Sequence, residues 1–190
     1  MYTDTLDEDA LVKAQHRYAG FGPRLGAALV DFLILLPLSG AGFYFTAVAH
    51  SLSIVVLATV LGMLYKPLME HYYAATVGKM ALKLRVIDEH GEWLSMGSAW
   101  LRYAPWLISG LVSLYVTVQI FGLPQFADID GFMDYAAFVG TDPYVSRLGK
   151  IQQYTGFLPL LSALVMLFNK PKQAAHDILA KSYVVYRDAA

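Results

Sequence analysis

The chain has 190 residues, of which 57% are apolar and only 15% are charged, and its formal net charge at pH 7 is -1. This balance excludes an ordinary soluble domain and gives no basic surface for nucleic acid. The chain has no cysteine, which excludes disulfides and thiol chemistry. The apolar residues gather in long uncharged runs, which are typical of membrane-spanning helices.

The first part of the chain is acidic and has no early apolar core. It does not have the pattern of a secretory signal peptide, so we expect the first apolar segment to remain in the mature protein. We interpret residues 1–22 as a cytoplasmic N-terminal segment and residues 23–190 as one membrane domain.

Four apolar segments follow, and a bilayer core about 30 Å thick needs a helix of about 20 apolar residues. We predict spans at residues 24–49, 52–69, 103–123 and 151–168. The fourth is the shortest, and it could instead be re-entrant or belong to a tilted helix that begins earlier. Each span contains a proline, which frees a backbone carbonyl that must find another partner in lipid. These prolines are Pro37, Pro67, Pro105 and Pro159.

Basic residues fix the predicted orientation. Of the 14 lysines and arginines, all except Arg147 and Lys150 lie before the first span, around the loop between the second and third spans, or in the C-terminal tail. Cytoplasmic loops are enriched in Lys and Arg. We therefore predict that both termini are cytoplasmic, which requires the fourth span.

The cytoplasmic loop contains "LKLRVIDEHGEWLS", which alternates, turns at His90-Gly91 and resumes. This pattern predicts a short hairpin, and the tail segment "SYVVYR" predicts a third strand beside it. We expect a cap of residues 76–96 plus 172–188 and an acidic, aromatic outer loop, 124–150, of short interfacial helices. The predicted fold is an all-α polytopic membrane protein, a four-helix transmembrane bundle with a small cytoplasmic β-hairpin or three-strand cap. No internal repeat is visible in the sequence.

Two charges interrupt the first apolar segment, Arg24 and Asp31. Seven residues turn an α-helix by about 700° and advance it by about 10.5 Å, so both lie on nearly one face. Arg24 can snorkel to the headgroups. A charged Asp31 at mid-membrane costs about 2.5 to 3.5 kcal/mol, so it needs a partner or a function. Either it accepts hydrogen bonds from Arg102, a tyrosine or a backbone amide, or it is a proton or cation site.

Three motifs in this order resemble the RDD family of small membrane proteins. They are "PRLGAALVD", which holds Arg24 and Asp31, "TVGKMALKLRVIDEHGEWLSMGSAWLR", and "AAHDILAKSYVVYR". The resemblance implies that Asp177 is the second aspartate of the family's charge motif, and we expect it to pair with Arg24 or Lys79. It also implies a prokaryotic cytoplasmic (inner) membrane and a role in cation/proton exchange, and it implies no catalytic residues.

Other motifs carry less information. Gly78-Lys79 lacks the earlier glycine and following Ser or Thr of a phosphate-binding loop. Glu70 lies four residues after Lys66, which predicts a modest ion pair and makes Glu70 the second candidate for ion or proton binding. No metal-ligand spacing and no nucleophile-base arrangement is visible, so we expect no metal, no cofactor and no enzyme.

Two functions remain open. One is a transporter of protons or monovalent cations with Asp31 as the titrating group, which would need a homo-oligomer or a membrane partner because the chain is small. The other is a non-catalytic scaffold or assembly factor that binds a partner protein, in which Arg24, Asp31 and Asp177 hold the fold.

Overall fold

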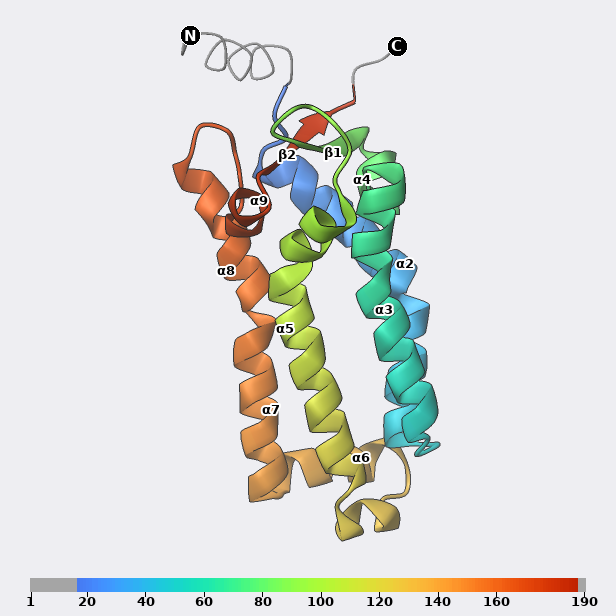
Figure 1. The fold of residues 1–190 in the computed structure, drawn as a ribbon. Coiled ribbons are helices and arrows are strands. Elements are labelled where there is room, and N and C mark those ends of the chain that lie inside the picture. Colours follow the sequence, from blue (N-terminus) through green and yellow to red (C-terminus); the bar gives the residue numbers. More distant parts are fainter. Residues whose placement is uncertain (1–16, 188–190) are drawn as a thin grey trace, which may run out of the picture. The chain divides into compact units, whose positions relative to one another are not determined.

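The computed structural model describes residues 17–187 (Figure 1). Residues 1–16, most of the predicted cytoplasmic N-terminal segment, lie outside the described residues, as does the end of the predicted cap. Four helical segments are long and apolar enough to cross a membrane: Phe21–Ala47, Leu52–Tyr73, Met96–Phe121 and Pro143–Phe168. The first three are the single helices α2, α3 and α5. The predicted class, a mostly helical protein with four apolar spans, is confirmed.

The fourth segment begins at Pro143, earlier than the predicted residue 151. It consists of α7 (Pro143–Gly156), α8 (Leu158–Leu164) and the 3-10 helix η2 (Val165–Phe168). Asp142 starts it as an N-cap, accepting hydrogen bonds from the amides of Tyr144 (2.8 Å) and Val145 (2.9 Å). Pro at the first helical position after such a cap favours a helix start. The alternative of a helix that begins earlier is therefore the one observed.

Pro159 accompanies the break between α7 and α8. Because proline has no N–H, it leaves the carbonyl of Thr155 without its usual partner four residues on. The hydroxyl of Ser109 on α5 donates to this carbonyl at 2.6 Å. The expectation that a freed carbonyl finds another partner is met at this proline.

We expect Ser109→Ala to lower the free energy of unfolding by about 0.6 to 1 kcal/mol, because it removes the interhelical hydrogen bond to the carbonyl of Thr155. Thermal unfolding in detergent measures the change. Ser53→Ala on α3 is the matched control, since Ser53 is exposed. Equal midpoints for the two variants would contradict the role given to Ser109.

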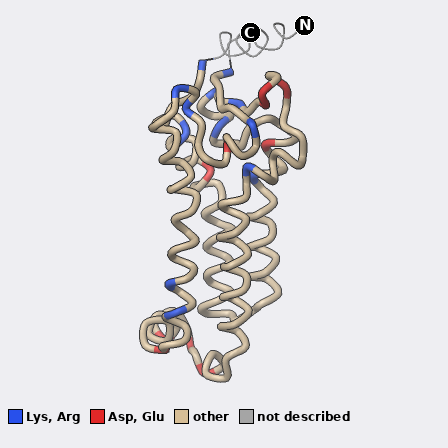
Figure 2. The backbone as a smooth tube through the Cα atoms, turned by 60° about the vertical axis from the view of Figure 1, so that its left-hand side comes forward, with Lys and Arg blue, Asp and Glu red and all other residues tan. Residues whose placement is uncertain are grey.

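The described chain divides into two compact units. The first comprises the described parts of Met1–Ile34, Tyr65–Ala104 and Leu161–Ala190, and the second comprises Leu35–Leu64 and Pro105–Leu160. The first unit contains α4 (Val77–Ala81), β1 (Leu84–Asp88), α9 (Ala175–Leu179) and β2 (Ser182–Tyr186). The second contains η1 (Pro124–Asp128) and α6 (Gly131–Thr141). In Figure 2, Lys and Arg gather in the first unit, while long helical stretches carry no charge.

The sheet of the first unit has two strands, not the three predicted. β1 pairs with β2 in antiparallel register, with Val86 opposite Val184 at the centre. Residues 89–95 do not return as a strand, because Ser95 accepts a hydrogen bond from the amide of Ser98 (3.1 Å) and starts α5 at the next residue. Instead, the segment before α2 extends the sheet by one isolated bridge between Tyr18 and Val185.

An internal repeat is present, contrary to the expectation from the sequence. Each copy is a five-residue helix, one capping residue, a lysine with positive φ and a five-residue strand. The copies are α4–Lys83–β1 and α9–Lys181–β2, and both strands have the same order of buried and half-buried residues. Val86 is the third residue of β1 and Val184 is the third residue of β2, so the two valines occupy equivalent positions in the two copies. They also lie opposite each other in the sheet. A local two-fold axis therefore passes between them.

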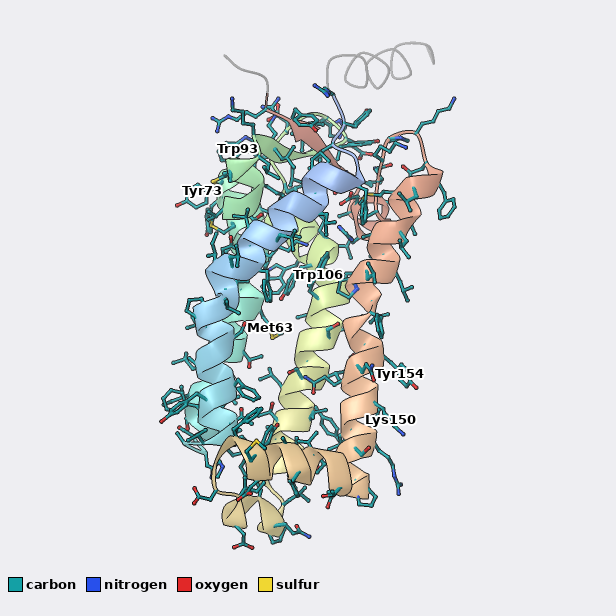
Figure 3. All side chains as sticks on the ribbon, turned by 180° about the vertical axis from the view of Figure 1, so that it is seen from behind. Met63, Tyr73, Trp93, Trp106, Lys150 and Tyr154 are labelled. Atoms are coloured by element: carbon teal, nitrogen blue, oxygen red, sulfur yellow. The ribbon has the colours of Figure 1, made fainter. Side chains whose placement is uncertain are left out.

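The second unit has its own apolar core. Six buried residues of α5, η1, α7 and the adjoining loop form it: Val116, Ile120, Phe126, Ile129, Val145 and Leu148. Gly110 on α5 gives space for Met63, because a Cβ there would lie 2.9 Å from the methionine sulfur (Figure 3). The helices η1 and α6 lie within the predicted outer loop.

Candidate functional site

Glu70 on α3 is fully buried in the first unit. Arg102 on α5 donates from Nε to Oε2 at 2.9 Å, and the Lys79 amine on α4 donates to Oε1. Such charge-assisted bonds are about twice as strong as neutral ones. Burial lowers the pKa of Lys79, although the charge of Glu70 opposes the shift. Both carboxylate oxygens of Glu70 are thus held by cationic groups.

Asp177 on α9 is the second buried carboxylate, also fully buried. Arg24 on α2 pairs with Oδ2, and Nη1 of Arg102 lies 2.7 Å from Oδ1. Burial raises the pKa of Asp177, but the guanidinium groups of Arg102 and Arg24 outweigh it and hold this pKa well below its usual range. Arg102 therefore joins two carboxylates from different elements, and Asp177 stays ionised.

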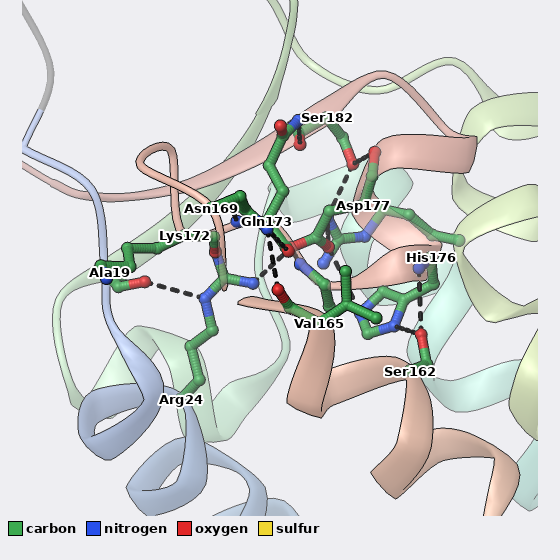
Figure 4. A network of polar contacts seen from close by, with 12 residues as sticks. Ala19, Arg24, Ser162, Val165, Asn169, Lys172, Gln173, His176, Asp177 and Ser182 are labelled. Atoms are coloured by element: carbon green, nitrogen blue, oxygen red, sulfur yellow. Dashed lines mark hydrogen bonds and ion pairs between the residues drawn. The ribbon is translucent and has the colours of Figure 1, made fainter. Parts of the chain in front are cut away.

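Arg24 ties the beginning of the described chain to its end (Figure 4). Its Nε donates to the carbonyl of Ala19 at 3.0 Å and its Nη2 to the carbonyl of Lys172 at 2.7 Å. The predicted pairing of Asp177 with Arg24 is present. The expectation that Arg24 snorkels to headgroups is wrong, because its side chain is only 9% exposed and its donors bind protein.

His176 and Ser162 extend this network (Figure 4). The amide of His176 donates to the Ser162 hydroxyl oxygen at 3.0 Å, and that hydroxyl lies 2.8 Å from Nδ1. In the tautomer in which Nδ1 accepts the serine proton, the imidazole proton lies on Nε2, 3.3 Å from Asp177 Oδ1. Burial lowers the pKa of His176 well below its ordinary value, against the attraction of Asp177. His176 is thus neutral at pH 7.

Asp31 on α2 has a different environment. Its Oδ1 accepts hydrogen bonds from the Tyr65 hydroxyl and from the Gly78 amide, both at 2.7 Å. Within the described residues no hydrogen bond reaches Oδ2, and the side chain is half-buried. A tyrosine and a backbone amide, rather than Arg102, are therefore the partners. Both of these donors are neutral groups.

Gly78 is required at its position by packing. A Cβ there would lie 2.0 Å from the carbonyl oxygen of Ala27 and 2.9 Å from Cγ of Asp31. The backbones of α4 and α2 thus approach more closely than any side chain permits. This close approach brings the amide of Gly78 onto Asp31.

The sequence identified some of these residues and missed others. Glu70 is in the network, but Lys79 and Arg102 bond its oxygens, and Lys66 adds a favourable charge interaction. Five residues of the network were not predicted as site residues: Lys79, Arg102, Ser162, His176 and Ser182. Four of the five lie in the family motifs, which was the available signal: Lys79, Arg102, His176 and Ser182. In residues 17–187 no group of three or more His, Asp or Glu side chains could hold a metal ion.

Four membrane-length helical segments and a buried network of ion pairs define a polytopic α-helical membrane protein. The RDD family model matches residues 18–181, most of the chain, and the chain belongs to the RDD family. No curated protein and no solved structure matches the chain.

Proposed function

We propose that this RDD protein exchanges monovalent cations for protons and that Asp31 is the exchange site. The observation that carries the proposal is the asymmetric environment of this carboxylate. Its Oδ1 accepts hydrogen bonds from two neutral donors, while Oδ2 accepts no hydrogen bond from residues 17–187. A carboxylate without a cationic partner keeps a charge that a proton or an alkali cation can neutralise. Because a proton and an alkali cation compete for the same carboxylate oxygen, the transport of one is coupled to the transport of the other.

The other two buried carboxylates are poorer exchange sites. Glu70 and Asp177 each contact two cationic groups. Protonating either would leave buried cations uncompensated, which costs several kcal/mol. We therefore assign Glu70 and Asp177 to holding the fold, and we place Glu70 behind Asp31 as a candidate for ion binding.

The distribution of charge supports an orientation. Among the described residues, Arg147 and Lys150 are the basic residues of the second unit, and all others belong to the first. By the positive-inside rule the first unit faces the cytoplasm, with both termini, in a prokaryotic inner membrane. Four spans form a small carrier, so we also propose that it works as a homo-oligomer or with a membrane partner.

The test is exchange in liposomes that contain the purified protein and an imposed pH gradient. We expect addition of Na⁺, K⁺ or Li⁺ to collapse the gradient with wild-type protein and not with Asp31→Asn. Asp134→Asn is the matched control, because Asp134 is an exposed aspartate on α6. Size-exclusion profiles of all three proteins establish that they fold. The proposal would be refuted if added cations did not collapse the pH gradient in wild-type vesicles, or if they collapsed it equally with Asp31→Asn.

A scaffold role is the second candidate. It is favoured by α6, an 11-residue helix without a single buried residue, which offers a surface to a partner protein. In a scaffold, Asp31→Asn would weaken the fold or the complex, and the liposomes would stay tight with the wild-type protein.

A further inference from the structure

The two copies of the internal repeat each have a buried side and an exposed side. In α4 the buried residues are Gly78 and Lys79, and in α9 they are the equivalent His176 and Asp177. These residues contact the charge network and the Asp31 site. The opposite side of each short helix is apolar and exposed, and it contains Met80 and Leu82 in the first copy and Ile178 and Leu179 in the second.

A lysine with positive φ follows each short helix. Lys83 has a φ of 54° and Lys181 a φ of 47°, and both side chains are exposed. Lys181 contacts Glu89 at 3.1 Å, but its side chain is 72% exposed and the carboxylate is 38% exposed. A solvent-exposed pair of this kind contributes little and exchanges partners readily. Because the strands are antiparallel, the two lysines lie at opposite ends of the two-stranded sheet.

Both copies directly follow a membrane-length helical segment. α4 begins a few residues after α3 ends at Tyr73, and α9 begins shortly after η2 ends at Phe168. Exposed aromatic residues occur close to these points in the chain: Tyr72 and Tyr73 at the end of α3, Trp93 after β1, and Phe168 at the end of η2. Tyr73 and Trp93 are labelled in Figure 3. Aromatic residues of this kind gather where membrane meets water. The exposed apolar sides of α4 and α9 therefore follow closely, along the chain, the ends of membrane-length helical segments.

The charge of this region complements an anionic leaflet. The first unit exposes or half-exposes seven basic residues outside the buried network: Arg17, Lys83, Arg85, Lys170, Lys172, Lys181 and Arg187. Apart from the half-buried Asp31, the acidic residues exposed or half-exposed on the described part of this unit are Asp88, Glu89 and Glu92. Clusters of Lys and Arg beside membrane helices attract anionic lipid.

We propose that α4–Lys83 and α9–Lys181 are two related binding sites for anionic phospholipid. The exposed apolar side of each short helix packs against the first carbons of the acyl chains, and the lysine binds the headgroup phosphate. The two-fold relation gives two separate sites, one at each end of the sheet. This proposal does not depend on cation exchange, and it holds for a scaffold equally.

Native mass spectrometry of the full-length protein in non-ionic detergent tests the proposal. Phosphatidylglycerol and phosphatidylcholine are added as probes of equal chain length. We expect the wild type to retain two phosphatidylglycerol molecules that phosphatidylcholine does not replace. Lys83→Gln and Lys181→Gln should each retain one, and the double variant none. Because both side chains are exposed, the thermal midpoint without lipid should not change.

Lys150→Gln is the control, since this exposed lysine belongs to α7 of the second unit and extends away from the helix (Figure 3). It should retain two lipids. Met80→Gln keeps Lys83 but removes apolar contact, and it should retain one. Equal retention of the two lipids, full retention by the double variant, or loss in only one of the lysine variants would overturn the proposal.

Discussion

Arg102→Leu is expected to lower the free energy of unfolding by about 3 to 5 kcal/mol, the cost of removing one partner from a buried ion pair. Arg102 is 1% exposed and contacts Glu70, Asp177 and Ser182. Its removal leaves each carboxylate with a single cation, and leucine cannot replace the lost donors. Denaturant unfolding in mixed micelles measures the loss.

A conservative variant and a surface control accompany this prediction. Arg102→Lys keeps the charge but not the forked donors that reach both carboxylates, so it should recover only part of the stability. Arg147→Leu removes an exposed arginine and should change the free energy of unfolding by less than about 0.5 kcal/mol. If Arg102→Leu unfolds at the same denaturant concentration as Arg147→Leu, the buried network does not stabilise the fold.

Gly78→Ala is expected to have the second largest effect. The added methyl would lie 2.0 Å from a backbone carbonyl of α2, and a helix backbone cannot give way as a side chain can. α4 must move, which breaks the bond from the Gly78 amide to Asp31. We expect a loss of about 1 to 3 kcal/mol for the overpacking, together with altered cation selectivity or rate in the liposome assay.

The control for this substitution is Gly149→Ala on α7, where a Cβ would meet no atom within 4 Å. Alanine in a helix interior with free space should stabilise the protein by up to about 1 kcal/mol. If Gly78→Ala lowers the free energy of unfolding and Gly149→Ala raises it, the close approach of the two helix backbones, and not helix propensity, requires glycine at position 78. A Gly78→Ala protein as stable as wild type would contradict the packing seen around Asp31.

The spans were predictable because a bilayer imposes a length and a composition on single helices, and both are local properties of the sequence. Asp177 was predictable only through the family motif. The fourth span begins earlier than its apolar composition predicts, because Asp142 and Pro143 lie in a polar segment and yet form a helix start. The polar residues around Asp142 and Pro143 are typical of a loop, so composition alone does not indicate the helix start.

The charge network and the sheet depended on contacts between distant segments. Arg102 joins Glu70 to Asp177 across three elements. It ends a family motif, but the motif does not indicate which two carboxylates it contacts. The hairpin is predicted from alternation in residues 82–95, but that pattern does not identify the strand that pairs. The repeat escaped notice because its two copies share geometry and burial rather than residue identity.

That repeat bears on how such a chain can arise. Duplication and fusion of a gene for a two-span protein produces two helix-lysine-strand copies in one polypeptide, where the ancestor would form them as a homodimer. Lys79 and Asp177 occupy equivalent positions in the two copies. In a homodimer these positions carry the same residue and hence the same charge. Joining the copies in one chain frees them to differ, so that a cation in one half and an anion in the other can enter a single buried network.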